Sequence, residues 1–434
     1  MPEIRILDGS SVNLEAALDR RGISRDTETE RIVEEIIQDV RTRGDAALLE
    51  SARKFDSPFL DSIVPSESEW LGAKLPKEQQ NAIRVAFQRI VEFHQRQFEA
   101  LTSGLKDSAI FQARPNVRLG QRYLPLKSAG LYVPGGGAAY PSSVLMLSGP
   151  ASAAGVKELV LTTPARRDGR LHPAVLAAAV HAGVRSVFKV GGAAAIAALA
   201  LGTETVPRVD KIAGPGNRFV NEAKRQLWGQ VGLDGYAGPS EVAVLADETA
   251  NPVFAAADLI TQVEHAPDNA AFLICIGRET LDRILAEIDR QLVDAPRAET
   301  IRAALKNESL AIVARDIKEG IALVNKIAPE HVSVAVKDAD SARWITNAGC
   351  VLVGEWTPES VSDYCLGPSH TLPTGGSARF ASPVNVLDFL KIQSIASLTQ
   401  EQLKELAPVA ETFAAMEGFP AHGFGASVRY PKRS

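Results

Sequence analysis

The sequence predicts an α/β protein with two Rossmann-like, doubly wound α/β domains, one inserted in the other, plus a helical N-terminal segment and a C-terminal tail. Two observations lead to this fold class. Short apolar runs typical of strands alternate with helical runs of about ten residues, an alternation that indicates βαβ units and parallel sheets. The alternation pauses near residues 232–239 and then resumes, which indicates two units.

The first quarter of the chain is predicted to be mostly helical. Apolar residues recur at helical spacing from Thr27 to Phe55, and a second helical run covers Gln79 to Phe98. Between Ala109 and Val133 the pattern changes to short extended pieces that end at Pro134-Gly135-Gly136-Gly137. Residues 1–128 are therefore assigned to a helical segment that leads into the first α/β domain.

The inserted domain is predicted to span residues 129–238. Strands are expected at residues 129–133, 158–162, 186–190 and 208–213, and helices at 173–182, 192–201 and 218–228. The second α/β domain is assigned to residues 239–384, with strands expected at 242–246, 271–276, 310–313, 332–335 and 350–353 and helices between them. Residues 385–434 are predicted to be a helical tail, with its helix at 400–417.

Composition excludes several classes of protein. The chain has 434 residues, of which 45% are hydrophobic and 23% charged, and its net charge is −5. The charges are interspersed, so no basic face for nucleic acid is expected. Neither a leader peptide nor an uninterrupted apolar span is found, and three cysteines form no paired framework. We therefore expect a cytoplasmic location and no membrane partner.

Four of the seven histidines lie in the C-terminal half, each near a carboxylate in a short polar break between apolar stretches. They are His265, His331, His370 and His422. Imidazole and carboxylate oxygen are common zinc ligands, and a catalytic zinc keeps a position open for water or substrate. The distribution therefore predicts one metal-dependent active site assembled from distant segments.

The sequence neighbours of His265 and His331 indicate different roles for these two histidines. Gln262 and His265 lie three residues apart near the end of a helix expected from Pro252, so they project from one face; a solvated helix end is the alternative. Glu330 and His331 are adjacent at the start of a strand, where neighbouring side chains point in opposite directions. Separate acid/base roles are therefore favoured for this pair, with a capping interaction as the alternative.

The segment from Asp363 to His370 follows the strand at residues 350–353 and runs on into a loop rich in Gly and Pro. We expect it beyond the carboxyl edge of the sheet, where α/β proteins bind ligands, although an ordinary surface loop is the alternative. Cys365 is interpreted as an inert thiol rather than a nucleophile. The segment from Glu417 to His422 lies near the chain end and needs a metal bond or a substrate contact to hold it in place.

Three glycine-containing loops in the inserted domain join a strand to a helix. They contain Tyr132 to Gly136, Gly191-Gly192 and Gly214-Pro215-Gly216-Asn217. Each can present backbone N–H groups and a helix N-terminus to an anion such as a pyrophosphate. None has the GxGxxG fingerprint with its later acidic residue, so tight turns are the alternative.

Over nearly its whole length the chain resembles the histidinol dehydrogenase family. The resemblance is carried by LYVPGG at 131–136, GPGN at 214–217, GPSE at 238–241, QVEH at 262–265, PEH at 329–331, the stretch 363–375, and EGFPAH at 417–422. It implies a homodimer with one Zn²⁺ per subunit and shared active sites. It implies the oxidation of L-histidinol through L-histidinaldehyde to L-histidine with two NAD⁺, the final steps of histidine biosynthesis.

The resemblance also implies roles for individual residues. Gln262, His265, Asp363 and His422 are expected to hold zinc, with His422 supplied by the partner subunit. Substrate contacts are expected from these four residues together with Ser240, His331, His370 and Glu417. His331 is expected to accept the protons, Glu330 to activate water, and Tyr132 and Asn217 to contact NAD⁺.

One position departs from the family pattern. Family members usually carry Gln in Gly-Gly-Ala-Gln-Ala, where this chain has Ala194. We therefore expect Ala194 to occupy a cofactor-binding position without the usual polar contact, and we expect Ala194→Gln to strengthen NAD⁺ binding. Two rival interpretations stay open: an enzyme of this type acting on another alcohol, and a catalytically silent, zinc-stabilised binding protein.

Overall fold

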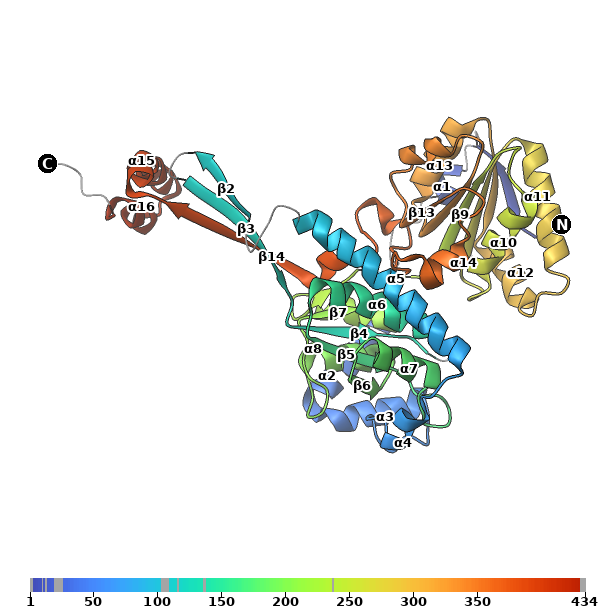
Figure 1. The fold of residues 1–434 in the computed structure, drawn as a ribbon, viewed down its shortest axis with the longest axis horizontal. Helices are drawn as coiled ribbons and strands as arrows, with labels where there is room; N and C mark the ends of the chain where they lie inside the picture. The colour runs from blue at the N-terminus through green and yellow to red at the C-terminus, as the bar shows by residue number, and fades with distance from the viewer. Residues whose placement is uncertain are drawn as a thin grey trace. The chain divides into compact units, whose positions relative to one another are not determined.

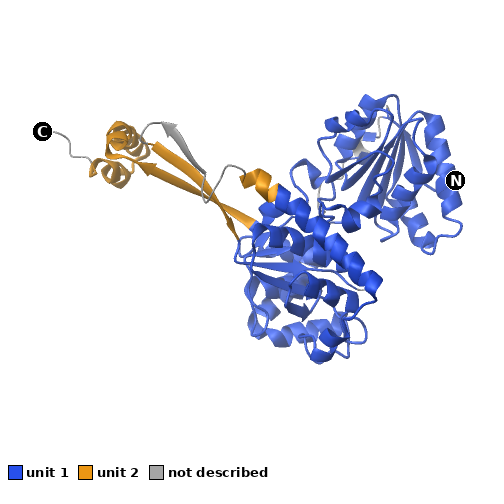
Figure 2. Cartoon of the chain, viewed as in Figure 1, with its two compact units in different colours: residues 1–96, 126–389 blue, residues 97–125, 390–434 orange. Residues whose placement is uncertain are grey.

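The computed structural model describes residues 3–9, 11, 14–18, 26–102, 109–114, 117–135, 138–235 and 238–429. The chain divides into two compact units (Figure 2). The first unit comprises residues 1–96 and 126–389, and the second comprises residues 97–125 and 390–434.

The first parallel sheet of the first unit has the strand order β6-β5-β4-β7-β8, which is 3-2-1-4-5 when the strands are counted from β4. Every neighbouring pair in it is parallel. The order reverses between β4 and β7, and ligands in open α/β sheets bind at such a point. The strands are β4 (Ser128–Tyr132), β5 (Glu158–Thr163), β6 (Ser186–Lys189), β7 (Lys211–Ala213) and β8 (Gly232–Leu233).

Helices from two parts of the chain cover this sheet. Helices α2 (Thr27–Arg43), α3 (Asp45–Phe55), α8 (Gly192–Leu201) and α9 (Arg218–Leu227) share one apolar cluster with strand residues such as Val160 and Ile212. Helices α6 (Pro141–Ala154) and α7 (Pro173–His181) pack together, and α6 contacts β4. Helices α4 (Glu67–Gly72) and α5 (Lys77–Thr102) complete the N-terminal segment.

The second sheet is also entirely parallel, with the order β1-β11-β10-β9-β12-β13. Alternate residues of β9 and β10 belong to two separate apolar clusters, one with α10, α11 and α12 and the other with α1 and α13. The helices of the two clusters lie on opposite sides of this sheet (Figure 1). The elements are β1 (Arg5–Asp8), α1 (Leu14–Leu18), β9 (Glu241–Ala246), α10 (Pro252–Val263), β10 (Ala270–Ile276), α11 (Arg278–Gln291), α12 (Ala298–Asn307), β11 (Leu310–Ala314), α13 (Ile317–Ile327), β12 (His331–Ala335) and β13 (Cys350–Val353).

The predicted α/β class with parallel sheets is confirmed, and several elements correct the finer predictions. Strand β1 and helix α6 were not predicted from the sequence. The helical run from Thr27 to Phe55 is two helices, because Gly44 has a φ of 54° and ends the first of them. That value lies in the left-handed region, where glycine carries no Cβ penalty.

The second unit is built on an antiparallel sheet with the order β14-β3-β2. Its strands are β2 (Ala109–Arg114), β3 (Val117–Pro125) and β14 (Leu390–Leu398), followed by α15 (Gln400–Glu417) and α16 (Pro420–Ser427). The helix expected at 400–417 is confirmed. The prediction of a helical tail omits β14, whose side chains are mostly exposed and so lack the apolar pattern of a buried strand.

No helix among the described residues combines the length and apolar character needed to cross a membrane.

Candidate active site

The candidate site lies at the amino edge of the second sheet. Ser240 immediately precedes β9, and His331 is the first residue of β12, in register with Val242 of β9 and Cys350 of β13. The expectation of a site beyond the carboxyl edge of this sheet is therefore wrong. The segment after β13 returns to the amino edge through α14 (Glu359–Val361) and a π-helical turn, η2 (Ser362–Leu366), which brings Asp363 next to His331.

Helix α10 also ends at this edge. Asn251 caps it by accepting a hydrogen bond from Val253 N at 3.0 Å, and Pro252 occupies the first turn, as the sequence predicted. The helix ends at Val263, so His265 lies beyond the helix and not on its face. Gln262 is buried, whereas His265 is exposed.

Gln262 and Glu330 form the buried floor of the site. Gln262 Nε2 donates to Glu330 Oε2 at 3.2 Å, and the backbone N–H of Glu241 donates to the same oxygen at 2.9 Å. Burial raises the pKa of Glu330 to about 8. With its nitrogen bound to Glu330, the Gln262 amide keeps a buried Oε1 that has no hydrogen-bond partner among the described residues.

His331 lies against a different neighbour. Its Nε2 is 3.2 Å from Asp363 Oδ1, and its side chain is 2% exposed, so the imidazole is held out of water. Burial lowers the pKa of His331, but the carboxyl groups of Glu359 and Asp363 outweigh it and raise the value to about 10. The two adjacent residues thus have separate partners, Gln262 for Glu330 and Asp363 for His331.

The loop after Asp363 is fixed by bonds to other segments of the same unit. His370 Nδ1 lies 2.9 Å from the Asp363 carbonyl oxygen, and its Nε2 lies 3.1 Å from Ser143 Oγ on α6. Gly375 N donates to Glu241 Oε1 at 3.0 Å. The loop is therefore joined both to the start of β9 and to the helix that follows β4 in the first sheet.

Two acidic residues near His331, Glu359 and the half-buried Asp258, were missed by the sequence reasoning. Glu359 is fully buried, and neither of its carboxyl oxygens has a hydrogen-bond partner among the described residues. Asp258 accepts a hydrogen bond from Ser333 Oγ at 2.6 Å, and burial raises the pKa of both carboxyl groups. The available signal was helical spacing, since Asp258 lies four residues before Gln262 and Glu359 four before Asp363.

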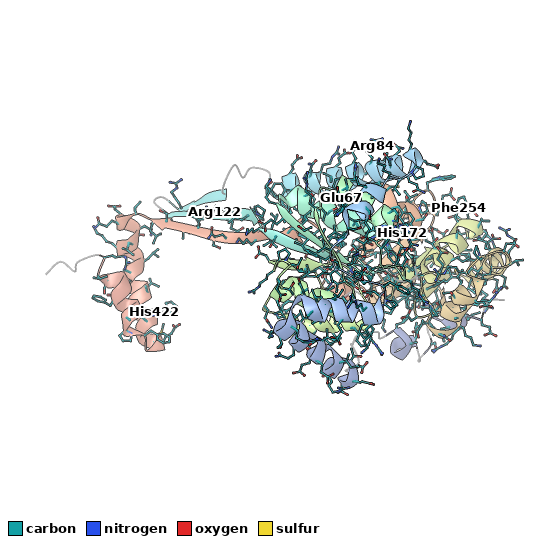
Figure 3. All side chains as sticks on the ribbon, turned by 90° about the horizontal axis from the view of Figure 1, so that it is seen from below. Glu67, Arg84, Arg122, His172, Phe254 and His422 are labelled. Atoms are coloured by element: carbon teal, nitrogen blue, oxygen red, sulfur yellow. The ribbon has the colours of Figure 1, made fainter. Side chains whose placement is uncertain are left out.

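The predicted zinc ligands are only partly brought together. In the described parts of the chain, no three His, Cys, Asp or Glu side chains are arranged to hold a metal ion. Of the predicted set, Gln262, His265 and Asp363 belong to the first unit. Burial raises the pKa of Asp363, but the hydrogen bond and the charge of His331 outweigh burial and lower it. His422, labelled in Figure 3, lies on α16 of the second unit, and Glu417 ends α15. The roles of both residues stay predictions.

The glycine-containing loops each follow a strand of the first sheet and precede a helix, as predicted, so they lie at the carboxyl edge of this sheet. Tyr132 ends β4, and its buried hydroxyl accepts a hydrogen bond from Gly192 N at 3.2 Å. Burial raises the pKa of this phenol to about 12, so it stays protonated. A Cβ built on Gly214 would overlap the carbonyl oxygen of Tyr132. The loop after β7 therefore contacts the loop after β4, at the point where the strand order of the sheet reverses.

A buried ion pair holds the loop after β7. Lys224 Nζ donates to the Gly214 carbonyl oxygen at 2.6 Å and to Asp234 Oδ1 at 2.7 Å, while Gly214 N donates to Asp234 Oδ2 at 2.7 Å. Asn217 caps α9, since its Oδ1 accepts from Phe219 N and Val220 N. The loop is therefore rigid, and the Asn217 amide nitrogen is the polar group that its side chain can still offer a ligand.

Ala194 lies in the first turn of α8 and is 1% exposed within the apolar cluster of the first sheet. Its methyl group packs in the core and offers no polar contact. The expected gain from Ala194→Gln stays a prediction, and it requires the longer side chain to leave this packed position.

The chain is similar to known proteins over nearly its whole length. The histidinol dehydrogenase family model matches residues 19–430. The chain is 43% identical to histidinol dehydrogenase from Nitrosomonas europaea, over 99% of this chain and 100% of that protein. It is 42% identical to the enzyme from Geobacter metallireducens, over 98% of each chain.

A solved structure gives the same result. The crystal structure of histidinol dehydrogenase from Elizabethkingia anophelis superposes with a TM-score of 0.92 and 34% sequence identity, over 99% of this chain and 98% of that one. The matches cover nearly the full length, so they include both sheets and the second unit. The chain therefore belongs to the histidinol dehydrogenase family, whose members are NAD-dependent oxidoreductases of histidine biosynthesis.

Proposed function

We propose that this protein oxidises L-histidinol through L-histidinaldehyde to L-histidine, with two NAD⁺ per substrate and one zinc ion per subunit. The observation that carries the proposal is the group formed by the buried Gln262, Glu330 and His331 together with Asp363 at one sheet edge. An acid/base pair and two oxygen ligands lie together there, and each catalytic side chain has its own partner.

The first step removes a proton and a hydride from the alcohol. His331 would accept the hydroxyl proton, a role that its buried ring beside Asp363 supports. Asp363 is one of the carboxylates, after Glu359, that raise the pKa of His331, so a divalent cation held by Asp363 would lower that pKa and favour the neutral imidazole that can accept a proton. NAD⁺, when bound, takes up the hydride.

The second step converts the aldehyde to the acid and needs one water molecule. Glu330 is buried with a pKa of about 8, which suits a group that accepts a proton from water and later releases it. Two hydrogen bonds to Oε2 fix its carboxyl group. The hydrated aldehyde then loses a second hydride, and His331 accepts the hydroxyl proton as before.

The residues present fit a zinc ion. The buried Gln262 Oε1 faces away from Glu330 and lacks a hydrogen-bond partner among the described residues, as a ligand oxygen would before the ion binds. Gln262, His265, Asp363 and the partner subunit's His422 would hold the ion. Zinc would anchor the amine and imidazole of the substrate, a templating role. Ser240, His370 and Glu417 would contact the substrate.

The first sheet would bind NAD⁺ at its carboxyl edge, with Tyr132 and Asn217 as contacts. Open space beside Gly192 supports a cofactor site there, because a Cβ built on this glycine would meet no atom within 4 Å. The neighbouring loop residues Gly135 and Gly191 instead pack closely against Pro164. The bond between His370 and Ser143 connects this edge to the catalytic group, since α6 begins directly after the Tyr132 loop.

The proposal includes the finer architecture. Residues 129–238 would form the inserted Rossmann-like NAD-binding domain, and residues 239–384 the α/β domain with the metal and substrate. Support comes from the separate parallel sheets at 128–233 and 241–353, joined in the second sheet by the N-terminal strand β1. A cytoplasmic location is part of the proposal and agrees with three free cysteines.

The stoichiometry of the reaction tests this proposal. We expect two NADH per L-histidinol consumed, and loss of both when the protein is treated with a chelator, with recovery on addition of Zn²⁺. Stopped-assay measurement of NADH and L-histidine gives the ratio. A single NADH per alcohol would indicate oxidation of another kind, and no NADH at all would indicate a silent binding protein.

Exposed apolar residues of the second unit support a homodimer that shares its active sites. Leu406, Val409, Phe413 and Met416 recur at helical spacing on α15 and are 40%, 52%, 56% and 68% exposed. A contiguous apolar stripe of this kind is typical of an interface. It directly precedes Glu417 and His422, the residues proposed to reach the partner's site.

We expect Phe413→Glu to shift the protein to monomers and to lower activity at least about tenfold, because a charge in the centre of an apolar interface costs a few kcal/mol. Analytical ultracentrifugation measures the shift to monomers, and the rate of NADH formation measures the activity. Lys404→Gln, an exposed position on the same helix with the same change of one charge unit, serves as the control. A Phe413→Glu dimer with full activity would contradict the shared-site arrangement.

A further inference from the structure

The first sheet lacks the acidic residue that a dinucleotide-binding fold uses for its ribose. In that fold a carboxylate about twenty residues after the glycine-rich turn accepts a hydrogen bond from the adenosine ribose 2′-hydroxyl. From residue 150 to residue 165 this chain has one acid, Glu158. Glu158 begins β5, at the end of the strand opposite the cofactor loops, and pairs with Lys127 at 3.5 Å.

A carboxylate from the N-terminal segment occupies the carboxyl end of the same strands. Asp56 follows α3, and the backbone N–H of Gly191 donates to its carboxylate. A Cβ built on Gly191 would lie 3.3 Å from Asp56 Oδ1 and 2.8 Å from Pro164 Cβ. Pro164 directly follows β5, and Gly191 lies two residues after β6, so Asp56 is beside both strand ends.

The position of Asp56 is fixed by its neighbours. Ser57 Oγ donates to the Arg167 carbonyl oxygen at 2.9 Å, and Asp56 N donates to the Ala52 carbonyl oxygen at 2.9 Å. The charge of Asp56 contributes to the raised pKa of Tyr132, which places the two side chains near one another. The carboxylate is therefore held next to the loop that ends β4.

Asp56 carries a negative charge that forms no ion pair with any of the described residues. Burial raises its pKa to about 6, so the group is ionised above neutral pH. Within the described ranges no salt bridge to Asp56 is found. Two arginines follow Pro164, but Arg166 pairs with Asp168 at 3.5 Å, and Arg167 contacts this segment through its carbonyl oxygen.

We propose that Asp56 binds the ribose 2′-hydroxyl of NAD⁺ and excludes the 2′-phosphate of NADP⁺. The inference rests on the proposed NAD⁺ site at the carboxyl edge of the first sheet. A carboxylate accepts a hydrogen bond from a hydroxyl and repels a phosphate, so one side chain produces both effects. The N-terminal segment would thus supply the acidic residue that the usual dinucleotide-binding sequence carries after its glycine-rich turn.

Binding measurements on the full-length protein test the proposal. Isothermal titration gives the Kd of NAD⁺ and of NADP⁺ at pH 8 for the wild type, Asp56→Ser and Glu158→Gln. We expect Asp56→Ser to weaken NAD⁺ binding about tenfold and to reduce the preference for NAD⁺ over NADP⁺ about a hundredfold. Glu158→Gln removes the same charge from the other end of β5 and should leave the preference unchanged.

A second variant covers the case in which Asp56→Ser does not fold. Asp56→Asn keeps an acceptor for Gly191 N–H and removes only the charge, so its NADP⁺ affinity should rise while its melting temperature stays near that of the wild type. An unchanged NAD⁺ to NADP⁺ preference in a folded Asp56 variant overturns the assignment of Asp56. Failure of the wild type to bind NAD⁺ overturns the proposed function itself.

Discussion

Replacing His331 by asparagine is expected to lower kcat about 10³-fold for both L-histidinol and L-histidinaldehyde, because both half-reactions need a group that accepts a hydroxyl proton. Asparagine is close in size and keeps a polar group beside Asp363, but it cannot take up a proton. The proposed zinc ligands and the other proposed substrate contacts keep their own side chains, so KM should change less than kcat. Separate assays with the alcohol and with the isolated aldehyde measure the two rates.

The matched control for His331→Asn is His94→Asn. His94 is also fully buried, and its Nδ1 lies 2.8 Å from the Ile90 carbonyl oxygen on α5, so its replacement tests the cost of losing a buried imidazole. Melting temperatures show whether each variant folds. A folded His331→Asn enzyme with nearly normal rates in either half-reaction would assign proton transfer to another residue.

The parallel strands could be predicted from the sequence because they are apolar on both faces. Strands such as β9 and β10 are buried along nearly their whole length, so they stand out as short continuous apolar runs between helical segments. Strand β14 could not be predicted in this way. Its residues are mostly exposed, and the nine residue pairs that it forms with β3 depend on backbone bonds that leave no pattern in the side chains.

The site residues could be named from the sequence, but their place in the fold could not. Asp363 follows β13, and proximity in sequence indicated the carboxyl edge of the sheet. The π-helical turn at 362–366 and the bond from Gly375 to Glu241 instead return this segment to the amino edge. This change of direction depends on tertiary contacts between residues more than a hundred positions apart. The periodicity of apolar residues in the sequence gives no information about such contacts.

The acidic residues around the site show a similar limit. Glu359 and Asp56 have ordinary sequence surroundings, one after a proline and one at a helix end. Only burial separates them from the many solvated carboxylates of the chain, and burial depends on what packs over them. Tyr132 and Gly214, in contrast, lie in turns that contain glycine. Glycine in the sequence indicates a turn or a close backbone contact, so these positions could be predicted.

Replacing Glu330 by glutamine is expected to separate the two half-reactions. Oxidation of L-histidinol to the aldehyde needs no water, so its rate should stay within about twofold of the wild type. Oxidation of the aldehyde should slow about 10²- to 10³-fold, because glutamine cannot accept a proton from the water that adds to the carbonyl carbon. L-Histidinaldehyde, trapped with semicarbazide, should then accumulate with one NADH per L-histidinol.

The choice of glutamine makes the result interpretable. Its side-chain oxygen can still accept the hydrogen bond from Glu241 N, so the start of β9 keeps its place. Gln262 loses a charged acceptor, and zinc content measured on the same preparation reports whether the metal site survives. Each preparation supplies its own control, because both substrates are tested on one variant. Equal losses on alcohol and aldehyde, with zinc retained, would show that Glu330 acts in a step common to both oxidations and not on the water.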